Sequence, residues 1–599
     1  MRIAHWLRPN AKTELPTNLV FVDTETKPVQ VADNREAHSL WFGEACHVRI
    51  QEQRGREYRT ESYFHFENPL DFWDWIAYLN REGSKLYIFA HNWNFDGAIL
   101  RTASILREIG YDTLQYINGK PPFILRLKRD KRFLALIDTL NYFQSSLDKL
   151  GESIGIDKLE MPCYSDSMEK WTEYCRRDVD VIKTAVLNLR DFVEANDLGS
   201  FRPTLASQAM NAFRHRFYEG GILIHDDEKT LELERSGYFG GRVECFQLGK
   251  VRKKLHYLDV NSLYPFIMSE KQFPMQLKRS TRKMTLEALG ELLKSYAVVA
   301  RVSLSTDEPV YPTRDTGRLV FPVGEFQTTL NTPELAYALR NNHIVEIHHA
   351  SVYEQGYLFA PFVNALYALR QGYEKADNPA FAYLCKILMN SLYGKFGQRG
   401  SLWEEIEYNG EPPGDEWLEE DFQTGKVYRY RIRLGNVQRL SREAEARESF
   451  PAIAAHVTAY ARMLMWRLIL QAGEGHIFYS DTDSLIVDNV GYKNLEPFIH
   501  QTKLGSLKVE SEANVAVFYG PKDYRFGTVE KHKGIKKNAQ QVAENIWQQI
   551  QFHSWDWHLQ NTEDGIIYID TITKTLQREY KKGDVQSDGR VKPFTRHFE

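Results

Sequence analysis

Cysteine is scarce in this sequence, and long apolar runs are missing. The chain has 599 residues and five cysteines, none of which form a C-x-x-C pair, so the sequence predicts neither a disulfide framework nor a cysteine zinc site. No apolar run approaches the roughly 18 residues that span a bilayer. The first 16 residues also lack the apolar stretch of a secretory signal. We therefore expect reduced thiols, no membrane segment and a cytoplasmic location.

The chain also lacks a large excess of either positive or negative charge. The chain has 76 Lys and Arg residues against 80 Asp and Glu residues, which gives a formal net charge of -4. This balance alone counts against a nucleic-acid binder, but the basic residues are clustered, and local clusters matter more than the sum. The clusters lie at residues 126–132, 250–254 and 531–537. A solvated basic loop would explain any one of them taken alone.

The length and the patterning predict several domains of mixed α and β structure. At about 150 residues per domain, the chain is long enough for roughly four units, which excludes a single small binding module. Short β-rich runs alternate with amphipathic helical stretches at residues 171–193 and 454–471. Residues 398–450 begin with many acids and turn residues and continue with a basic, aromatic stretch. We interpret them as an insertion with its own hairpin.

Carboxylates gather in the N-terminal third of the chain. Asp23 and Glu25 end an apolar strand at positions i and i+2, so both side chains point to one face. Asp96 follows a second apolar run, and Tyr174 and Asp178 share one face of a helix. A lone pair of acids at a strand end is usually solvent-exposed. Four such carboxylates together could hold two divalent ions for phosphodiester hydrolysis, with Tyr174 orienting the attacking water.

A second set of acids lies downstream. Asp259 ends an apolar strand before an S-L-Y-P turn, and Asp481 and Asp483 lie in a tight turn between two apolar runs. Acidic turns are usually exposed, but these flanking runs are apolar enough to bury the hairpin. Because buried acids at a hairpin tip repel each other, they need a cation.

A polar helical face lies between the two parts of this second set. Lys386, Asn390 and Tyr393 recur at i, i+4 and i+7, so a cation, an amide and an aromatic ring would meet one ligand. An incoming nucleotide needs such contacts, with Lys386 at the phosphates and Asn390 and Tyr393 at the sugar and base pair. A polar helix face by itself is more often only solvated.

In this order, the segments resemble the motifs of family B DNA polymerases. D-x-E at Asp23, N-x-x-F-D ending at Asp96 and Y-x-x-x-D ending at Asp178 resemble the motifs of the proofreading 3′–5′ exonuclease. The segments around Asp259, Lys386 and Asp483 resemble the three polymerisation motifs of the same family. The resemblance spans Asp23 to about Lys537. It implies an enzyme that adds dNTPs to a 3′-hydroxyl by two-metal phosphoryl transfer and edits its product.

The resemblance also implies roles for individual residues. Asp259, the Val260 carbonyl and Asp483 would hold two Mg²⁺ ions, with Mn²⁺ as a possible substitute, and Asp481 would tune the site. Two further ions would bind to Asp23, Glu25, Asp96 and Asp178. Tyr264 would pack under the sugar and exclude a 2′-hydroxyl. The residues expected to bind the dNTP are Ser262, Leu263, Tyr264, Lys375, Lys386, Asn390 and Tyr393.

Further short matches imply DNA contacts. A Y-x-G-G element at Tyr238 would let the backbone approach a template phosphate, and a K-x-Y element at Lys522 would grip the primer terminus. The residues expected to bind DNA are Asn92, Phe95, Thr204, Ser207, Tyr238, Gly240, Gly241, Lys522, Tyr524 and Lys533.

The implied fold is an RNase H-like exonuclease domain, residues 1–198, followed by a right-hand polymerase. The palm would be residues 199–270 and 451–537, the fingers 362–397 and the thumb 538–599. The long gaps between the polymerisation motifs leave room for two insertions, residues 271–361 and 398–450. In these respects the chain is similar to the compact, protein-primed polymerases of bacteriophages and linear plasmids. In those enzymes the insertions contact the priming protein and close a ring around DNA, which gives processivity and strand displacement.

The expected partners are template and primer DNA, dNTPs and a terminal priming protein, and we expect a monomer. Three alternatives stay open. The chain could be a primer-independent polymerase of the same family, a nuclease with a structural polymerase half, or a non-catalytic DNA-binding scaffold. The scaffold is disfavoured because an idle site has no physical reason to keep clustered, repelling acids.

Overall fold

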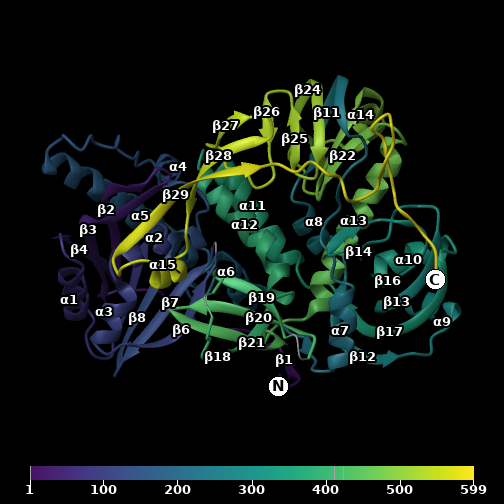
Figure 1. Cartoon of the computed structure of the whole chain (residues 1–599). Coiled ribbons are helices and arrows are strands. Elements are labelled where there is room, and N and C mark those ends of the chain that lie inside the picture. The colour runs from purple at the N-terminus through teal and green to yellow at the C-terminus, as the bar shows by residue number, and fades with distance from the viewer. Residues whose placement is uncertain (1, 120, 411, 422–423, 599) are drawn as a thin grey trace.

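The structure is a computed structural model that describes residues 2–119, 121–410, 412–421 and 424–598. The N-terminal third of the chain and residues 271–361 lie on opposite sides of the molecule (Figure 1). Between them lie a second sheet and the helices α11 (Ala360–Lys375), α12 (Pro379–Phe396) and α13 (Pro451–Ala472). Among the described residues, no helix is long and apolar enough to cross a membrane.

A ten-stranded sheet organises the N-terminal third. Its parallel centre consists of β2 (Asn18–Ala32), β5 (Lys85–Ala90) and β8 (Arg132–Asp138). Residues 19–22 are fully buried, as expected for a central strand that is covered on both faces. The 28-residue helix α5 (Met168–Ala195) packs on β2 and β3 (Arg35–Gln53), which confirms the helix predicted at 171–193.

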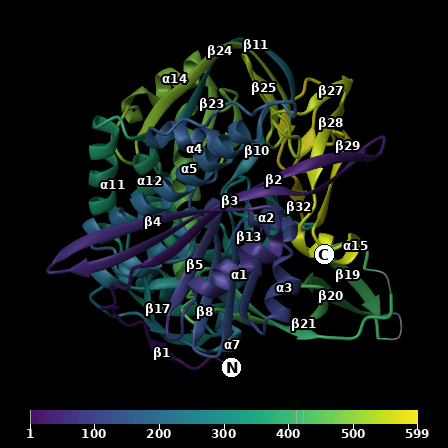
Figure 2. The same cartoon turned by 90° about the vertical axis from the view of Figure 1, so that its left-hand side faces the viewer.

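The C-terminal segment continues the ten-stranded sheet. Its strand β29 (Ile566–Thr575) pairs with β3 and extends the sheet through β28 (Ile546–Phe552) and β27 (Gln540–Ala543). The assignment of residues 538–599 to a thumb stays a prediction. Residues 26–40 of β2 and β3 form a long arm that reaches β29 (Figure 2). The edge of this arm offers unpaired backbone groups, which explains why a strand is added there.

A seven-stranded antiparallel sheet lies beside α13. Its strand order is β10-β22-β23-β11-β24-β25-β26. Helix α13 is buried on nearly all sides and packs against α8 (Leu263–Glu270) and α12. It therefore forms the core beside the seven-stranded sheet. The strands are β10 (Val243–Cys245), β11 (Gly249–Val260), β22 (Ile477–Asp481), β23 (Ser484–Asp488), β24 (Leu507–Gly520), β25 (Asp523–Phe526) and β26 (Val529–Lys531).

Both expected insertions contain sheets of their own. Residues 271–361 supply β12 (Phe273–Thr281), β13 (Ala297–Thr306), β16 (Val323–Asn331) and β17 (Ile344–Gly356), and β32 (Thr595–Arg596) pairs with β16 from the far end of the chain. The hairpin expected within residues 398–450 is part of a four-stranded sheet. Its strands are β18 (Arg399–Glu405), β19 (Glu416–Asp421), β20 (Lys426–Arg433) and β21 (Asn436–Glu445).

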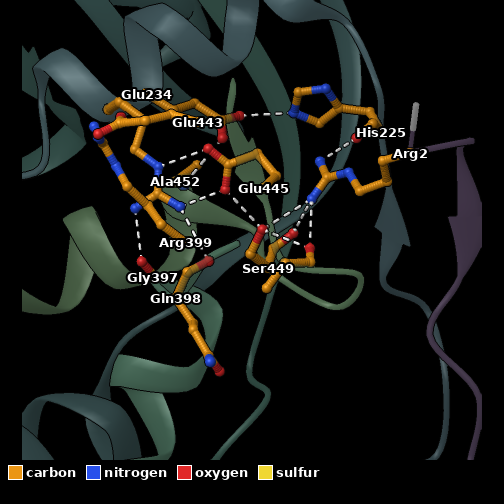
Figure 3. A network of polar contacts seen from close by, with 12 residues as sticks. Arg2, His225, Glu234, Gly397, Gln398, Arg399, Glu443, Glu445, Ser449 and Ala452 are labelled. Carbon is orange, nitrogen blue, oxygen red and sulfur yellow. Dashed lines mark hydrogen bonds and ion pairs between the residues drawn. The ribbon is translucent and has the colours of Figure 1, made fainter. Parts of the chain in front are cut away.

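A polar network fixes the root of this four-stranded sheet. Glu445, the last residue of β21, accepts a 2.8 Å hydrogen bond from Arg235 Nε and another of 2.8 Å from Ser449 Oγ. Arg2 donates to the Ser449 carbonyl at 2.7 Å, which brings the N-terminal segment into the same network (Figure 3). Arg235 also donates to the Gly397 carbonyl at 2.6 Å, just before β18. Both strands that leave the root are therefore held by Arg235.

Candidate active sites

The downstream acids meet at one end of the seven-stranded sheet. Strand β11 pairs with β23 so that Asp259 lies opposite Ser484, and the Val260 N–H donates to the Asp483 carbonyl at 2.8 Å. In the β22–β23 turn, the Asp483 N–H donates to the Asp481 carbonyl at 2.7 Å. Pairing of two strands that are far apart in the sequence thus brings the three acids together.

Burial and mutual repulsion shift the titration of these acids. Burial, followed by the charge of Asp483, raises the pKa of Asp259 to about 7. Burial, followed by Asp481, raises the pKa of Asp483, while Lys386 and Lys508 act in the opposite direction. Half-buried carboxylates that resist ionisation side by side form an oxygen donor set that suits Mg²⁺. The residues present therefore fit the expected metal site.

Lys508 was not predicted from the sequence. It lies on β24 directly opposite Asp259 in the β11–β24 register. Its positive charge partly opposes the rise in the pKa of both Asp259 and Asp483. No motif surrounds this lysine, and its position follows only from the pairing of the two strands. Lys386 affects the same two acids from α12, where it is exposed at the expected helical face.

Two of the expected nucleotide residues form an aromatic wall next to the acids. The rings of Tyr264, on α8, and Tyr393, on α12, lie 4.9 Å apart. Burial raises the pKa of Tyr264 to about 12, so its hydroxyl stays neutral. With Tyr238 and Gly240, the two rings line a cavity of about 410 Å³. Three separate segments therefore contribute to one pocket.

The remaining expected nucleotide residues are placed differently. Ser262 accepts a 3.0 Å hydrogen bond from Arg370 Nη1, an arginine on α11 that sequence reasoning missed. Lys375 lies exposed at the last residue of the same helix. The side chain of Leu263 is buried in the core, so only its backbone is available to a ligand. Asn390 donates to the Lys386 carbonyl at 2.9 Å and stays within its own helix.

The Y-x-G-G element is held next to the acidic turn. Arg462 of α13 donates to the carbonyls of Phe239 and Gly240 at 2.8 and 3.0 Å, and a buried 2.7 Å ion pair with Glu334 holds Arg462 in place. A Cβ atom on Gly241 would lie 2.7 Å from Cγ2 of Thr482, the residue between Asp481 and Asp483. Glycine is needed here because any side chain would meet that of Thr482.

The K-x-Y element lies on the other side of the acidic turn. The Lys522 N–H donates to the Tyr479 hydroxyl at 2.9 Å, and Lys522 Nζ lies 3.9 Å from Asp481. The ring of Tyr524 lies 5.0 Å from that of Tyr479. Lys533 is exposed beyond β26. The pKa of Lys582 is lowered mainly by burial and further by the charges of Arg242 and Lys533. The structure therefore brings Lys522 and Tyr524 to the acids and places Lys533 farther along the chain.

The N-terminal acids meet where β2 faces α2 (Trp93–Ile99) and α5. Asp23 and Glu25 lie on β2, Asp96 lies in the first turn of α2, and Asp178 lies on α5. Thr24, between the two strand acids, donates to Asp96 Oδ1 at 2.7 Å. Tyr174 lies one turn before Asp178 on α5 and is buried.

The titration of all four acids is shifted upward. Burial, followed by the charges of Asp178, Asp96 and Glu25, raises the pKa of Asp23 well above its usual value. Burial, followed by Asp178, raises the pKa of Glu25 to about 8, and burial raises that of Asp96 to about 7. Burial also raises the pKa of Asp178, although Lys158 opposes it. The cluster therefore lacks enough positive charge among the described residues to balance four carboxylates.

One lysine in this cluster was not predicted from the sequence. Lys158 Nζ donates to Asp178 Oδ2 at 2.6 Å and lies 4.8 Å from the centre of the Tyr174 ring. The other oxygen, Asp178 Oδ1, is buried and has no hydrogen-bond partner among the described residues. Cys175 Sγ lies 3.6 Å from Asp23 Oδ2. The orphaned oxygen and the oxygen-rich donor set fit divalent ions, as the sequence predicted for this site.

The remaining expected DNA contacts surround the two sites. Asn92 has a positive φ of 90° and precedes α2, with its N–H bonded to the buried Asp138, and Phe95 is half-buried in the first turn of that helix. Thr204 and Ser207 cap α6 (Leu205–Ala212) reciprocally, so their polar atoms have a structural role. Both also line a cavity of about 810 Å³, which contacts Asn390 and Tyr393 on its far side.

Comparison with known proteins identifies relatives by sequence. Residues 153–411 match a model of the family described as DNA polymerase type B, organellar and viral. A probable DNA polymerase of Neurospora intermedia is 28% identical over 340 residues, which cover 54% of this chain and 34% of that protein. The DNA-directed DNA polymerase of Enterobacteria phage PRD1 is 24% identical over 486 residues, which cover 77% of this chain and 78% of that protein. The chain spans about a third of the length of the first fungal relative.

Solved structures show the same fold. The complex of Phi29 DNA polymerase with primer-template DNA and incoming nucleotide substrates matches with a TM-score of 0.65 and 17% identity, over 94% of this chain and 100% of that one. The complex of the same protein with primer-template DNA alone matches with a TM-score of 0.66. The expected mixed α and β fold of a right-hand polymerase joined to an RNase H-like domain is therefore confirmed.

Proposed function

The chain is related to the organellar and viral type B DNA polymerases, and we propose that it is a template-directed DNA polymerase that extends a 3′-hydroxyl with dNTPs. The observation that carries this proposal is the pairing of β11 with β23, which brings Asp259 and Asp483 together beside Lys386 and Lys508. A pair of carboxylates with lysines on either side is what phosphoryl transfer to a primer requires.

The residues around the acids divide the work of binding. Lys386, whose charge acts on Asp259, and Arg370, which donates to Ser262, would hold the triphosphate. Tyr264 and Tyr393 would form the floor of the sugar site, where a 2′-hydroxyl would meet the Tyr264 ring. When bound, two Mg²⁺ or Mn²⁺ ions would lower the pKa of the primer hydroxyl and neutralise the leaving pyrophosphate. Lys522 would contact the primer end next to Asp481.

A second activity, 3′–5′ proofreading, is proposed for the N-terminal cluster. Asp23, Glu25, Asp96 and Asp178 would hold two divalent ions, which would activate water and stabilise the leaving 3′-oxygen when bound. Tyr174 would orient that water. Lys158 opposes the burial-driven rise in the pKa of Asp178 through its 2.6 Å ion pair, and it would also offset the charge of the scissile phosphate.

The 810 Å³ cavity is a suitable path for a single template strand. Its wall combines polar groups, aromatic rings for base stacking and arginines for phosphates. It lies between β6 (Asp112–Asn118) and β7 (Phe123–Arg129) of the N-terminal sheet, α6 and the α12 face that carries Asn390 and Tyr393. A strand in this cavity would therefore reach the nucleotide pocket. The cationic and aromatic residues of the wall are Arg126, Arg202, Arg214, Lys395, Tyr142 and Tyr383.

Primer extension tests both activities together. With a 5′-labelled primer on a longer template and Mg²⁺, wild type should extend with dNTPs and degrade without them. Asp483→Ala should lose extension and keep degradation, and Asp23→Ala should do the reverse. Absence of both activities in wild type, with template binding unchanged in both variants, would support the scaffold instead. Degradation without extension in wild type, lost only in Asp23→Ala, would support a nuclease with a structural polymerase half.

Protein priming, strand displacement and a monomeric state are the finer parts of the proposal. They are supported by the two insertions and by the relation to a phage polymerase. A bare single-stranded template with dNTPs should give no product unless a small protein with a Ser, Thr or Tyr hydroxyl is added. Synthesis on the bare template would identify a primer-independent polymerase. The cytoplasmic location stays a prediction.

A further inference from the structure

A fully buried carboxylate joins three parts of the chain that are far apart in the sequence. Asp556 lies in α15 (Trp555–Asn561) and is 0% exposed. Its Oδ1 accepts from the Tyr116 hydroxyl at 3.1 Å and from the Leu434 N–H at 2.8 Å. Its Oδ2 accepts from Asn118 Nδ2 at 2.9 Å and lies 3.5 Å from Arg433 Nη1.

Each oxygen of Asp556 has one partner from each neighbouring part. Tyr116 and Asn118 belong to β6 (Asp112–Asn118) of the N-terminal sheet, whereas Arg433 and Leu434 form the β20–β21 turn. A buried carboxylate is costly unless all its acceptor sites are used and a cation is near. Asp556 is therefore satisfied only when the C-terminal segment, the N-terminal sheet and the four-stranded sheet are assembled together.

The turn itself is shaped to make this contact. Leu434 has a φ of 51°, in the left-handed region that a leucine rarely adopts, and Gly435 follows with a φ of 81°. A two-residue hairpin turn of this kind normally takes Asn-Gly. The strained Leu434 points its N–H at Asp556 and packs its side chain against the core of the N-terminal sheet. These two contacts offset the backbone cost, and strain of this kind marks functional positions.

Helix α15 is bound more firmly to the N-terminal half than to the turn. Trp555 is fully buried, and its ring lies 5.6 Å from that of Phe123. The backbone N–H of Trp555 donates to Asn94 Oδ1 at 3.0 Å. Toward the four-stranded sheet, the contacts beyond Asp556 include a 2.5 Å hydrogen bond from Ser554 to Asp415. Apolar burial thus holds α15 to the N-terminal sheet, while mainly polar contacts hold it to the insertion.

The insertion therefore forms an arch with two unequal ends. Its root is continuous with the flanking chain and is held by hydrogen bonds to Glu445 (Figure 3), and its tip meets Asp556. In both overall views, α15 lies beside the sheet of the insertion (Figure 2). If the arch opens, it opens at the tip, because the tip contact is small and polar whereas the root continues into the palm.

We propose that Asp556 is the latch that holds the tip of residues 398–450 closed over bound DNA. Asp556 is thus a positioning residue for processive synthesis, an inference that rests on the proposed polymerase function. The partner groups of the latch on the insertion are the Arg433 guanidinium and the Leu434 N–H. Chemistry at Asp259 and Asp483 does not require the latch, since a single insertion is complete before DNA needs to be retained.

The test compares product length per binding event with single-nucleotide insertion. Both are measured on primed circular single-stranded DNA, and a heparin trap prevents rebinding in the first case. Asp556→Ala should shorten the products roughly tenfold, while single insertion stays within about twofold of wild type. Asp556→Asn keeps the shape and some hydrogen bonds, so its products should be intermediate in length.

Asp564→Asn is the matched control. Asp564 follows α15 and forms a 2.9 Å ion pair with Arg101 of the N-terminal half, and it has no hydrogen bond or ion pair with the described residues of the insertion. Its product length should equal that of wild type. Equal product lengths for Asp556→Ala and Asp564→Asn would overturn the latch, as would a proportional loss of single insertion in Asp556→Ala and Asp556→Asn.

Hydrogen–deuterium exchange gives a readout that does not depend on activity. In Asp556→Ala, residues 427–437 should exchange faster by roughly tenfold or more, while residues 399–405 near the root keep their protection. If wild type fails to extend any primer, the proposed function falls, and the exchange of residues 427–437 still decides whether Asp556 holds the tip. Unchanged exchange there would overturn the latch.

Discussion

The two carboxylate clusters solve the same physical problem in different ways. In the downstream cluster, adjacent strands align the acids through backbone hydrogen bonds, and lysines surround them at longer range. In the N-terminal cluster, a strand and two helices supply four acids, and one lysine makes a direct 2.6 Å ion pair. The difference teaches that the first site depends on backbone geometry, whereas the second depends on a single charge contact.

The largest expected effect comes from removing that charge contact. Lys158→Met should reduce the degradation of single-stranded DNA roughly a hundredfold, because Asp178 would be left as a buried charge without its partner. Extension should be unchanged. Lys508→Met is the matched change in the downstream site, and it should reduce extension by roughly tenfold or less, since Lys508 acts at longer range. Rates under single-turnover conditions measure both. An equal loss in the two variants would remove the contrast between the sites.

Replacing a glycine beside the acidic turn should impair extension and spare degradation. Gly241→Ala would place a Cβ atom 2.7 Å from Thr482 Cγ2 and push the acidic turn away from β11. We expect extension to fall roughly tenfold. Degradation should stay at the wild-type rate. Gly372→Ala in α11 is the control, because no atom within 4 Å would meet its Cβ. Full extension by Gly241→Ala would show that the turn tolerates displacement.

The smallest expected effect is on stability as a function of pH. In the unfolded chain these carboxylates lose their protons near about pH 4. In the metal-free folded protein, Asp96 and Glu25 have pKa values of about 7 and about 8 because of burial and, for Glu25, the charge of Asp178. The folded state thus binds more protons in this window. The free energy of unfolding should therefore fall as pH rises from about 4 to about 8.

Magnesium should reverse this loss, because the ions bind the ionised carboxylates. We expect Mg²⁺ to raise the Tm by a few degrees near pH 9 and by less near pH 6, as measured by differential scanning fluorimetry. Glu25→Gln should remove more of this rise than Asp259→Asn, since the N-terminal cluster has more acids to neutralise. The same Mg²⁺ effect at both pH values would contradict the assignment of the raised pKa values.

Local patterns predicted the elements that carry the sites, because each depends on residues close in the sequence. The alternation of Asp23 and Glu25, the helix that carries Tyr174 and Asp178, and the hairpin around Asp483 all follow from period and polarity. Lys158, Arg370 and Lys508 could not be predicted in this way. Their roles depend on which segments pack or pair across long stretches of chain, and no periodicity encodes that choice.

The same limit applies to the C-terminal segment. Its strands have the alternation of any exposed sheet, so nothing in the sequence of β29 indicates β3 as its neighbour. Leu263 shows that a motif match can also mislead. The match predicted Leu263 as a nucleotide-binding residue, but its side chain packs in the core. A motif identifies which residues lie near a site, and packing decides which of their atoms face it.

The pairing of β29 with β3 also has a consequence for biosynthesis. A ribosome makes β3 early and β29 only after most of the chain has emerged, so the arm of β2 and β3 waits with an open edge throughout translation. Open edges recruit other strands, and contacts between distant segments form slowly. Yield in recombinant expression should therefore be more sensitive to temperature and chaperone supply than the finished molecule's stability would suggest.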